Sequence, residues 1–244
     1  MNRTFAFIQA RVSSSRFPGK VLAPLQGSPL IVYMVERVRR ATLVDEVVVL
    51  TSNDPSDDVL FAILVDEDIP AFRGSLHDVL QRFVDAANFF EATEIVRLTG
   101  DCPLIDPAVI DGVIAARREA GADYSSNVDP PTFPDGLDAE CFTREALDQA
   151  GLEAKTLPER EHVTLWMRSQ AAGLQRVNLS APVDCAALRL TVDYPDDLDA
   201  VQTLLQRMSG SYTADLYDML RALAKNPEIL HLNLHSRNEG LKLG

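Results

Sequence analysis

Residues 46–51, Glu-Val-Val-Val-Leu-Thr (EVVVLT), form an apolar run in which polar side chains do not alternate. A strand has this pattern when both of its faces are buried, as in a parallel sheet that helices cover on two sides. Other segments repeat the succession of strand and helix: strands at 4–10 (TFAFIQA), 69–72 and 94–99 (EIVRLT), and helices at 28–40, 56–65 and 76–90. The succession predicts an α/β fold with a mostly parallel sheet in an α/β/α three-layer arrangement.

The second half of the chain changes character at residues 127–136 (NVDPPTFPDG), where three prolines and a glycine predict a loop. Further elements are expected as strands at 138–142, 175–179 and 187–192 and as helices at 158–172, 195–208 and 214–224. We find no internal repeat and no linker. We therefore expect one domain over residues 1–244, with residues 127–180 as a small protruding arm. Upstream, Ser28 and Pro29 are expected as N-cap and first residue of their helix.

Composition and charge exclude several classes of protein. A hydrophobic content of 46% is ordinary for a packed core. No uncharged run approaches the length of a membrane span or of a signal peptide, so we expect a soluble cytoplasmic protein with no membrane partner. The net charge of −13 argues against a nucleic-acid partner. The three cysteines lie far apart without a C-x-x-C pair, which favours buried thiols over disulfides or a zinc site.

The loop Ala10-Arg-Val-Ser-Ser-Ser-Arg-Phe-Pro-Gly-Lys20 is a basic segment in an acidic chain, because no Asp or Glu precedes Glu36. It follows the first strand, and open α/β folds bind ligands at the carboxyl ends of their strands. Its cations, its serines and Gly19 are suited to a polyphosphate. The alternative is a solvated loop whose cations pair with acids elsewhere. A P-loop and a G-x-G-x-x-G fingerprint are both absent, which disfavours an ATPase or a dehydrogenase.

The pattern Ala10-Arg11-x-x-Ser14-x-Arg16-x-Pro18-Gly19-Lys20 resembles the nucleotide signature of the CMP-sugar synthetases, the 3-deoxy-manno-octulosonate and acylneuraminate cytidylyltransferases. It is most similar to their spore-coat polysaccharide biosynthesis branch, the F-type proteins. Ser13 departs from the glycine usual in that branch. Further matches follow in order along most of the chain: Phe72-Arg-Gly-Ser75, Asp78-Val-Leu-Gln-Arg82, Arg97-Leu-Thr-Gly-Asp-Cys-Pro-Leu-Ile-Asp106, Pro134-Asp-Gly-Leu137 and Glu159-Arg-Glu-His-Val-Thr164.

This resemblance implies a nucleotidyltransferase fold of the nucleotide-diphospho-sugar transferase type. The implied reaction joins CMP from CTP to an acidic sugar and releases pyrophosphate, for surface polysaccharide biosynthesis. The implied subunit arrangement is a homodimer formed through the arm. The resemblance also implies roles for individual residues: Arg11, Arg16 and Lys20 at the reacting phosphates; Ala10, Ser14, Arg73, Ser75 and Asp78 at the nucleotide; and Glu140, Arg160 and His162 at the acceptor. Arg73 could equally be a surface cation, and His162 an exposed residue of a first helical turn.

Two aspartates are the candidates for a metal site. Asp101 and Asp193 each follow an expected strand, at 94–99 and 187–192, so parallel strands would bring both to one crevice. Mg²⁺ prefers one or two carboxylates together with phosphate oxygens and water. A lone Gly-Asp is commonly a turn, but the resemblance makes Asp101 and Asp193 the expected Mg²⁺ ligands. Asp196 and Asp197 are interpreted instead as residues at the positive end of a helix that Pro195 begins.

Other functions remain open on the sequence alone. One rival is a nucleotidyltransferase that acts on a sugar phosphate, a polyol phosphate or a phosphonate. A nucleotide-sugar glycosyltransferase is disfavoured, because Asp66-Glu-Asp68 precedes a strand and no D-x-D motif stands at the expected site. A different class is a non-catalytic nucleotide-binding scaffold in the same pathway, which need not retain both acids and the loop cations. Their joint presence favours the enzyme.

Overall fold

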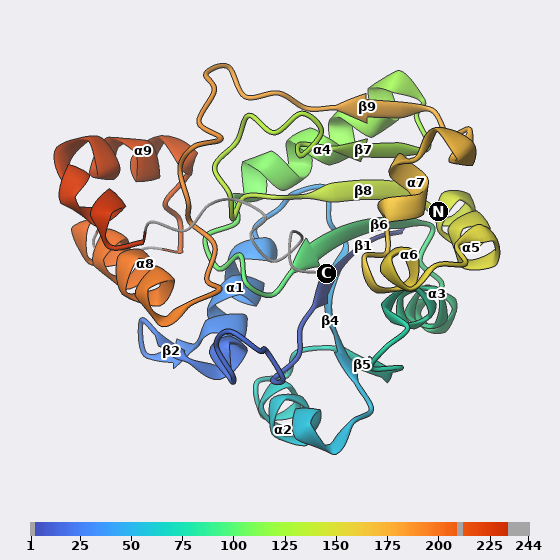
Figure 1. Cartoon of the computed structure of the whole chain (residues 1–244), viewed down its shortest axis with the longest axis horizontal. Helices are drawn as coiled ribbons and strands as arrows, with labels where there is room; N and C mark the ends of the chain where they lie inside the picture. Colours follow the sequence, from blue (N-terminus) through green and yellow to red (C-terminus); the bar gives the residue numbers. More distant parts are fainter. Residues whose placement is uncertain (1–2, 209–211, 234–244) are drawn as a thin grey trace.

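A seven-stranded sheet organises the computed structural model, which describes residues 3–208 and 212–233 (Figure 1). The strand order is β5-β4-β1-β6-β8-β7-β9. Every pairing is parallel except the two pairings of β8, so the predicted mostly parallel sheet is confirmed. The strands are β1 (Thr4–Gln9), β4 (Glu46–Ser52), β5 (Ala71–Gly74), β6 (Glu94–Thr99), β7 (Tyr124–Ser126), β8 (Glu140–Thr143) and β9 (Arg176–Asn178).

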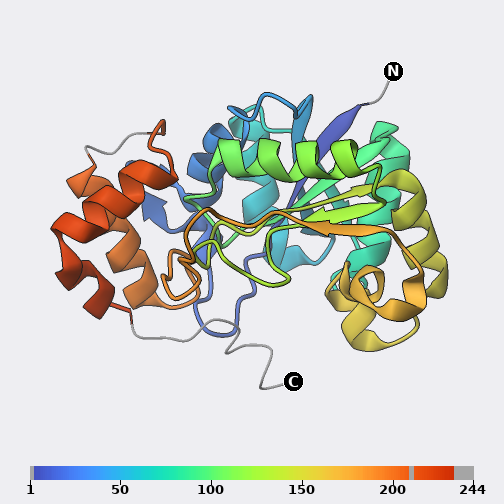
Figure 2. The same cartoon turned by 90° about the horizontal axis from the view of Figure 1, so that it is seen from above.

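Helices cover both faces of this sheet, which confirms the three layers (Figure 2). One core lies under α1 (Leu30–Val38), α2 (Asp58–Asp66), α4 (Pro107–Ala120), α8 (Pro195–Arg207) and α9 (Leu216–Lys225). The other lies under α3 (Val79–Phe90), α5 (Arg144–Glu153) and α7 (Leu165–Arg168), and the short α6 (Leu157–Glu161) packs beside α3. In the described residues, no helix has the length and apolarity needed to cross a bilayer.

The two cores explain why the strands contain apolar runs. In β1, Phe5 and Phe7 point into one core and Ala6 and Ile8 into the other. Neighbouring β4 behaves in the same way, with Val47 and Val49 on the α1 side and Val48 and Leu50 on the α3 side. Because successive side chains point to opposite faces, a strand with two covered faces needs apolar residues at every position. The EVVVLT run is thus a central strand of a covered sheet.

Two predicted elements in the second half are wrong. Residues 187–192 form no strand; Arg189 makes a single bridge to Asp135, while Val192 N donates to the carbonyl of Asp101 at 2.8 Å. Leu190 and Val192 are buried there, but the Arg189 guanidinium binds carboxylates instead of entering a sheet. The helix predicted at 158–172 is divided into α6, α7 and a 3-10 turn at Gln170–Ala172. The division falls where Val163 has a φ of 51°, which helical backbone cannot accommodate.

Smaller differences concern helix ends and elements that periodicity did not indicate. Ser28 and Pro29 form the short strand β3, which pairs with β2 (Pro24–Leu25), and the helix begins at Leu30 with Pro29 as its N-cap. The prediction that Pro195 starts a helix is confirmed. The helices α4 and α5 and the three-residue strand β7 were also not predicted along their length.

A buried arginine joins the first helix to two distant segments. Arg37 of α1 is fully buried, and its guanidinium donates four hydrogen bonds to main-chain carbonyls. Two of these carbonyls belong to Leu104 and Ile105, in the loop after β6, at 3.2 and 3.0 Å. The other two belong to Tyr212 and Ala214, before α9, at 3.0 and 2.8 Å. The loop that carries Asp101 is therefore held between α1 and the C-terminal helices, which Figure 1 shows beside α1.

Candidate active site

The basic loop at residues 10–20 is held in a defined shape at the carboxyl end of β1. Val12 N donates to Asp57 Oδ1 at 2.7 Å, and Gly19 N donates to the Val12 carbonyl at 2.9 Å, which closes the loop. Gly19 has a φ of 76°, a left-handed conformation that favours glycine, and it precedes the 3-10 turn Lys20–Leu22. Asp57 is buried and also accepts hydrogen bonds from the Ser52 amide and hydroxyl. The buried carboxylate thus joins the loop to the end of β4.

Four of the predicted site residues meet at this edge of the sheet. Lys20 Nζ lies 3.1 Å from Asp101 Oδ2 and 2.9 Å from Asp193 Oδ1. The guanidinium of Arg16 lies 2.7 Å from the same Asp193 oxygen and stacks over the Tyr194 ring at 5.5 Å. The structure therefore brings together two of the three loop cations, Arg16 and Lys20, and both predicted metal-binding acids. It does so although residues 187–192 are not a strand.

The ionised forms of these side chains stabilise one another. Burial by itself would raise the pKa of Asp101, but the charge of Lys20 and its hydrogen bond lower the pKa to about 2. The pKa of Asp193 is also lowered: burial and the charge of Asp101 oppose the shift, and Lys20 and Arg16 outweigh them. Burial disfavours the Lys20 ammonium, yet the two carboxylates raise its pKa above the usual value. All three groups are charged at neutral pH.

A second buried ion pair orients Asp193, and we did not predict it from the sequence. Arg189 binds Asp197 with Nε 2.9 Å from Oδ1, and its Nη2 lies 3.3 Å from Asp193 Oδ2. Asp197 in turn accepts the backbone N–H groups of Asp193 and Tyr194 at 2.8 and 3.0 Å. Asp197 therefore holds the turn at the start of α8, which agrees with its interpretation as a helix-end residue. The signal in the sequence was a single arginine inside an apolar run.

The remaining residues predicted at the nucleotide lie on two sides of the loop. Ala10 is buried and its N–H donates to the Leu50 carbonyl, whereas Arg11 is exposed. Ser14 Oγ accepts a weak bond from Phe17 N at 3.4 Å. On β5, Arg73 donates to the carbonyls of Ser52 and Asp54, at 2.8 and 3.1 Å, and pairs with Asp58. The end of β4 thus fixes the Arg73 guanidinium instead of leaving it in solvent.

Ser75 and Asp78 belong to the turn that begins α3. Asp78 is the N-cap of that helix, because its carboxylate accepts from Gln81 N at 2.9 Å. Ser75 Oγ accepts from Asp78 N at 3.0 Å. Arg160 of α6 binds the same Asp78 carboxylate at 2.6 Å. The structure therefore places Arg160, which we predicted at the acceptor, against a residue that we predicted at the nucleotide.

Glu140 and His162 lie in a second cluster, which is connected through Thr164. The Thr164 hydroxyl donates to Glu140 Oε1 at 2.7 Å, and Thr164 N donates to the His162 carbonyl at 2.5 Å. Glu140 is buried, accepts a hydrogen bond from the Tyr124 hydroxyl and forms an ion pair with Arg97. Burial lowers the pKa of His162, and the charge of Arg97 lowers it further.

Arg97 is a further residue that the sequence reasoning did not assign to the site. Its Nε donates to Gln9 Oε1 at 3.1 Å, so the side chain reaches the last residue of β1. The ion pair with Glu140 holds its other end. The signal was a charged residue within the apolar EIVRLT strand. Through Arg97, the Glu140 cluster adjoins the carboxyl edge of the sheet.

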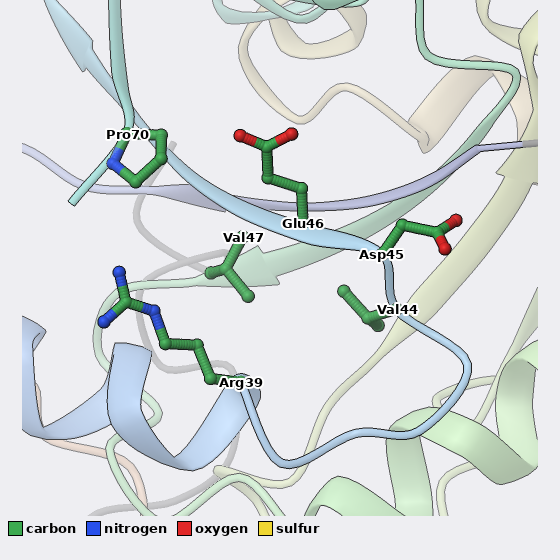
Figure 3. Close-up of a pocket in the computed structure, with 6 residues that line it drawn as sticks. All are labelled: Arg39, Val44, Asp45, Glu46, Val47 and Pro70. Atoms are coloured by element: carbon green, nitrogen blue, oxygen red, sulfur yellow. The ribbon is translucent and has the colours of Figure 1, made fainter.

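Two hollows lie away from the four central residues. One, of about 180 Å³, is at the amino end of β4, the opposite end from the basic loop, and Figure 3 shows its lining residues Arg39, Val44, Asp45, Glu46, Val47 and Pro70. The charged groups around it are already paired, with Arg39 on Glu36 and Glu46 on Arg3. The other, of about 390 Å³, follows β7 and β9 and includes Tyr124 and Arg168, so it borders the Glu140 cluster.

Comparisons with known proteins agree with this geometry. The family model described as Cytidylyltransferase matches residues 5–222. The chain is 35% identical over 236 residues to the spore coat polysaccharide biosynthesis protein SpsF of Bacillus subtilis (strain 168), covering 93% of this chain and 97% of that protein. A solved cytidylyltransferase from Leptospira borgpetersenii serovar Hardjo-bovis (strain JB197) is similar with a TM-score of 0.90 and 29% identity, covering 97% of this chain and 100% of that one.

A more distant solved structure supports the fold alone. It is CMP:2-keto-3-deoxy-manno-octonic acid synthetase complexed with CTP, with a TM-score of 0.68 and 21% identity. The match covers 84% of this chain and 99% of that one. The three-layer nucleotidyltransferase-like architecture is therefore shared well beyond the range of close sequence similarity.

Proposed function

The chain belongs to the cytidylyltransferase family, and from this premise we propose that it transfers CMP from CTP to an acidic sugar and releases pyrophosphate. The observation that carries the proposal is the convergence of Lys20, Arg16, Asp101 and Asp193 at the carboxyl edge of the sheet. A triphosphate needs concentrated positive charge, and the pair of acids can recruit a divalent cation to the same place.

We assign the triphosphate to the basic loop. Lys20 and Arg16 would bind the β and γ phosphates, and exposed Arg11 would lie near the α-phosphate, where displacement takes place. The buried Nε of Arg16 has no hydrogen-bond partner in the described structure, so one donor in the site is left unsatisfied. Ala10 and Ser14 would offer backbone and hydroxyl contacts. On the far side of the loop, Arg73, Ser75 and Asp78 would contact the base and ribose.

The donor set of Asp101 and Asp193 fits Mg²⁺. Two carboxylates are the usual protein contribution to a site that phosphate oxygens and water complete. Their ability to share a cation is supported by Lys20, whose ammonium lies within 3.1 Å of both. When bound there, Mg²⁺ would neutralise part of the negative charge on the triphosphate. Asp197 and Arg189 would keep Asp193 oriented, since they contact its backbone N–H and its carboxylate.

The reaction requires positioning and charge stabilisation and no covalent intermediate. The anomeric hydroxyl oxygen of the acceptor would bond to the α-phosphorus as the bond from that phosphorus to the bridging oxygen breaks. Pyrophosphate takes up the leaving electron pair, and the hydroxyl proton passes to solvent. Arg11 and Arg16 would stabilise charge on the phosphate oxygens, while Lys20 would stabilise the departing pyrophosphate.

We place the acceptor beside the Glu140 cluster. Arg97 and His162 would bind the sugar carboxylate and hydroxyls, and buried Glu140 would orient Arg97 through their ion pair. Arg160 would act between the two ends of the site, since it binds Asp78 and lies in the same short segment as His162. A carboxylate on the acceptor would find positive charge here, which favours an acidic sugar over a neutral one.

The experiment that tests this function is a pyrophosphate-release screen with CTP and Mg²⁺ against a panel of acidic sugars. Sugar phosphates, polyol phosphates and phosphonates form the comparison arm. We expect turnover with at least one acidic sugar and none in the comparison arm. Turnover confined to a phosphate or phosphonate acceptor would refute the acidic-sugar assignment, and no turnover with any acceptor would support the scaffold alternative.

Nucleotide choice is tested separately by thermal denaturation. A ligand that binds the native state raises the free energy of unfolding by mass action, by about 2.7 kcal/mol at a hundredfold excess over Kd, and so raises the melting temperature. CTP with Mg²⁺ should therefore shift the melting temperature well beyond ATP, GTP or UTP. Equal shifts for all four nucleotides would contradict the cytidine assignment. Asp101→Asn should abolish most of the pyrophosphate release while leaving the unliganded melting temperature within a few degrees.

We further propose a cytoplasmic homodimer in surface polysaccharide biosynthesis, joined through residues 127–180. Two features of the segment support an interface there. Among the described residues, its side chains Leu157 and Leu152 are the most exposed large apolar ones, at 84% and 71%. Strand β9 is also an edge of the sheet. In analytical sedimentation the wild type should be a dimer, and Leu157→Glu should shift the population toward monomer. A monomeric wild type would refute the interface.

A further inference from the structure

The ammonium group of Lys20 bridges the two acids that we assign to the metal. Nζ lies 2.9 Å from Asp193 Oδ1 and 3.1 Å from Asp101 Oδ2. Two other cations are near, but in the described structure Arg16 and Arg189 form ion pairs with Asp193 and none with Asp101. Lys20 is also well buried, with a side chain 10% exposed. Its charge therefore lies between the two carboxylates.

A cation at this place has an electrostatic function. Asp101 and Asp193 are like charges on separate segments of the chain, and they repel each other unless a positive charge lies between them. We propose that Lys20 substitutes for the metal in the ligand-free protein, keeping the two carboxylates together, and that the metal can bind both acids only after Lys20 has moved away.

The charge balance of the site gives the order of events. Lys20 and Arg16 together balance the charge of the two carboxylates, and the third nearby cation, Arg189, is shared with Asp135 and Asp197. A divalent metal that arrived alone would meet carboxylates that are already neutralised, with the Lys20 ammonium between them. A metal that arrives on a triphosphate brings several negative charges, to which Lys20 can transfer. The inference thus rests on the proposed function for its second half: the metal enters with the nucleotide, and Lys20 exchanges a carboxylate pair for a phosphate.

The first test uses Mn²⁺ alone, measured by the paramagnetic resonance signal of the free ion, on the nucleotide-free full chain. Lys20→Met should bind Mn²⁺ at least about tenfold more tightly than the wild type, which corresponds to ~1.4 kcal/mol. Lys225→Met, an exposed lysine in the last turn of α9, is the matched control and should leave the affinity unchanged. Unchanged or weaker binding by Lys20→Met, or no binding at millimolar Mn²⁺, would overturn the inference.

A second variant separates the bridging position from simple removal of charge. Arg16→Met removes one positive charge beside Asp193 but none between the two acids, so its gain in Mn²⁺ affinity should be several times smaller than that of Lys20→Met. Equal gains would mean that long-range charge alone explains the effect, which also overturns the inference. Lys20→Gln in the same titration replaces Lys20→Met if the latter melts well below the wild type.

The metal titration also distinguishes failure of the inference from failure of the proposed function. It contains no nucleotide and no acceptor. If Lys20→Met gains Mn²⁺ affinity but CTP does not stabilise the wild type, the cytidylyl transfer and the move of Lys20 to a phosphate are wrong, and the substitution of Lys20 for the metal stands. If CTP stabilises the wild type and Lys20→Met gains nothing, the exchange is wrong and the transfer stands.

Discussion

Replacement of Arg37 by methionine should destabilise the protein strongly. Methionine fills a similar volume but donates no hydrogen bond, so four carbonyls would lose their partner: the buried ones of Leu104, Ile105 and Ala214 and the partly buried one of Tyr212. A buried acceptor left unsatisfied costs at least about 1 kcal/mol, which gives ~4 kcal/mol for the four. For a chain of this length that free energy corresponds to a fall in melting temperature of about 8–16 °C.

The assay is urea unfolding followed by circular dichroism, with thermal denaturation beside it. Arg39→Met is the matched control, because Arg39 lies two residues further along, is exposed and pairs only with exposed Glu36 among acidic residues of the described chain. An exposed pair of this kind contributes ~0.5 kcal/mol or less. Losses of similar size in Arg37→Met and Arg39→Met would refute the reasoning that the four carbonyls depend on the guanidinium.

Three further predictions concern the site. In Asp57→Asn, one amide oxygen replaces the carboxylate that accepts from Val12 N and from the amide and hydroxyl of Ser52, so the basic loop loses support. CTP should then bind about tenfold more weakly by calorimetry, which corresponds to ~1.4 kcal/mol, and an unchanged affinity would contradict this. Burial, aided by Arg97 and Arg168, lowers the pKa of His162 below 6.5. The protein should therefore lose stability as the pH falls from 6.5 through the folded-state pKa, because the unfolded state takes up the proton first. Urea unfolding at pH 7.5 and at pH 5.0 measures this loss, which should be smaller in His162→Gln than in the wild type. Equal losses in the two proteins would disprove the prediction. Arg97→Met should raise the KM for the acceptor about tenfold and leave the KM for CTP within ~2-fold in pyrophosphate-release assays, whereas a matched rise in both would argue against an acceptor role.

The sequence was most informative about the fold where burial alone decides the structure. The apolar runs of β1, β4 and β6 are visible because each strand faces two cores. The same criterion was misleading at residues 187–192, where Leu190 and Val192 are buried but the segment binds the Asp101 main chain instead of a strand. Strand β7 gave no such signal. Two of its three residues are buried serines, and Ser125 is accommodated by a hydrogen bond to the Val113 carbonyl, a contact that only the packed structure supplies.

The candidate site divides in a similar way. Lys20, Asp101 and Asp193 could be predicted because a motif marked each of them, and Lys20 and Asp101 also follow a strand of the sheet. Arg189 and Asp57 could not be predicted, because each holds another residue in place through contacts that only tertiary packing creates. Arg189 holds Asp193 directly and through Asp197 at the start of α8, and Asp57 holds the basic loop from the 3-10 turn after β4. Positioning residues of this kind have no motif of their own.

The central position of β1 has a consequence for how the protein is made. The strand is the first to leave the ribosome, but its pairing partners β4 and β6 are synthesised later. The partners of Lys20 come later still in part, because Asp101 and Asp193 follow it by 81 and 173 residues. Contacts at such sequence separation form slowly, because the intervening chain must first be ordered. A nascent chain that has reached residue 180 can therefore build most of its sheet while the basic loop still lacks one of its acids, so the proposed nucleotide site is complete only after Asp193 has been synthesised.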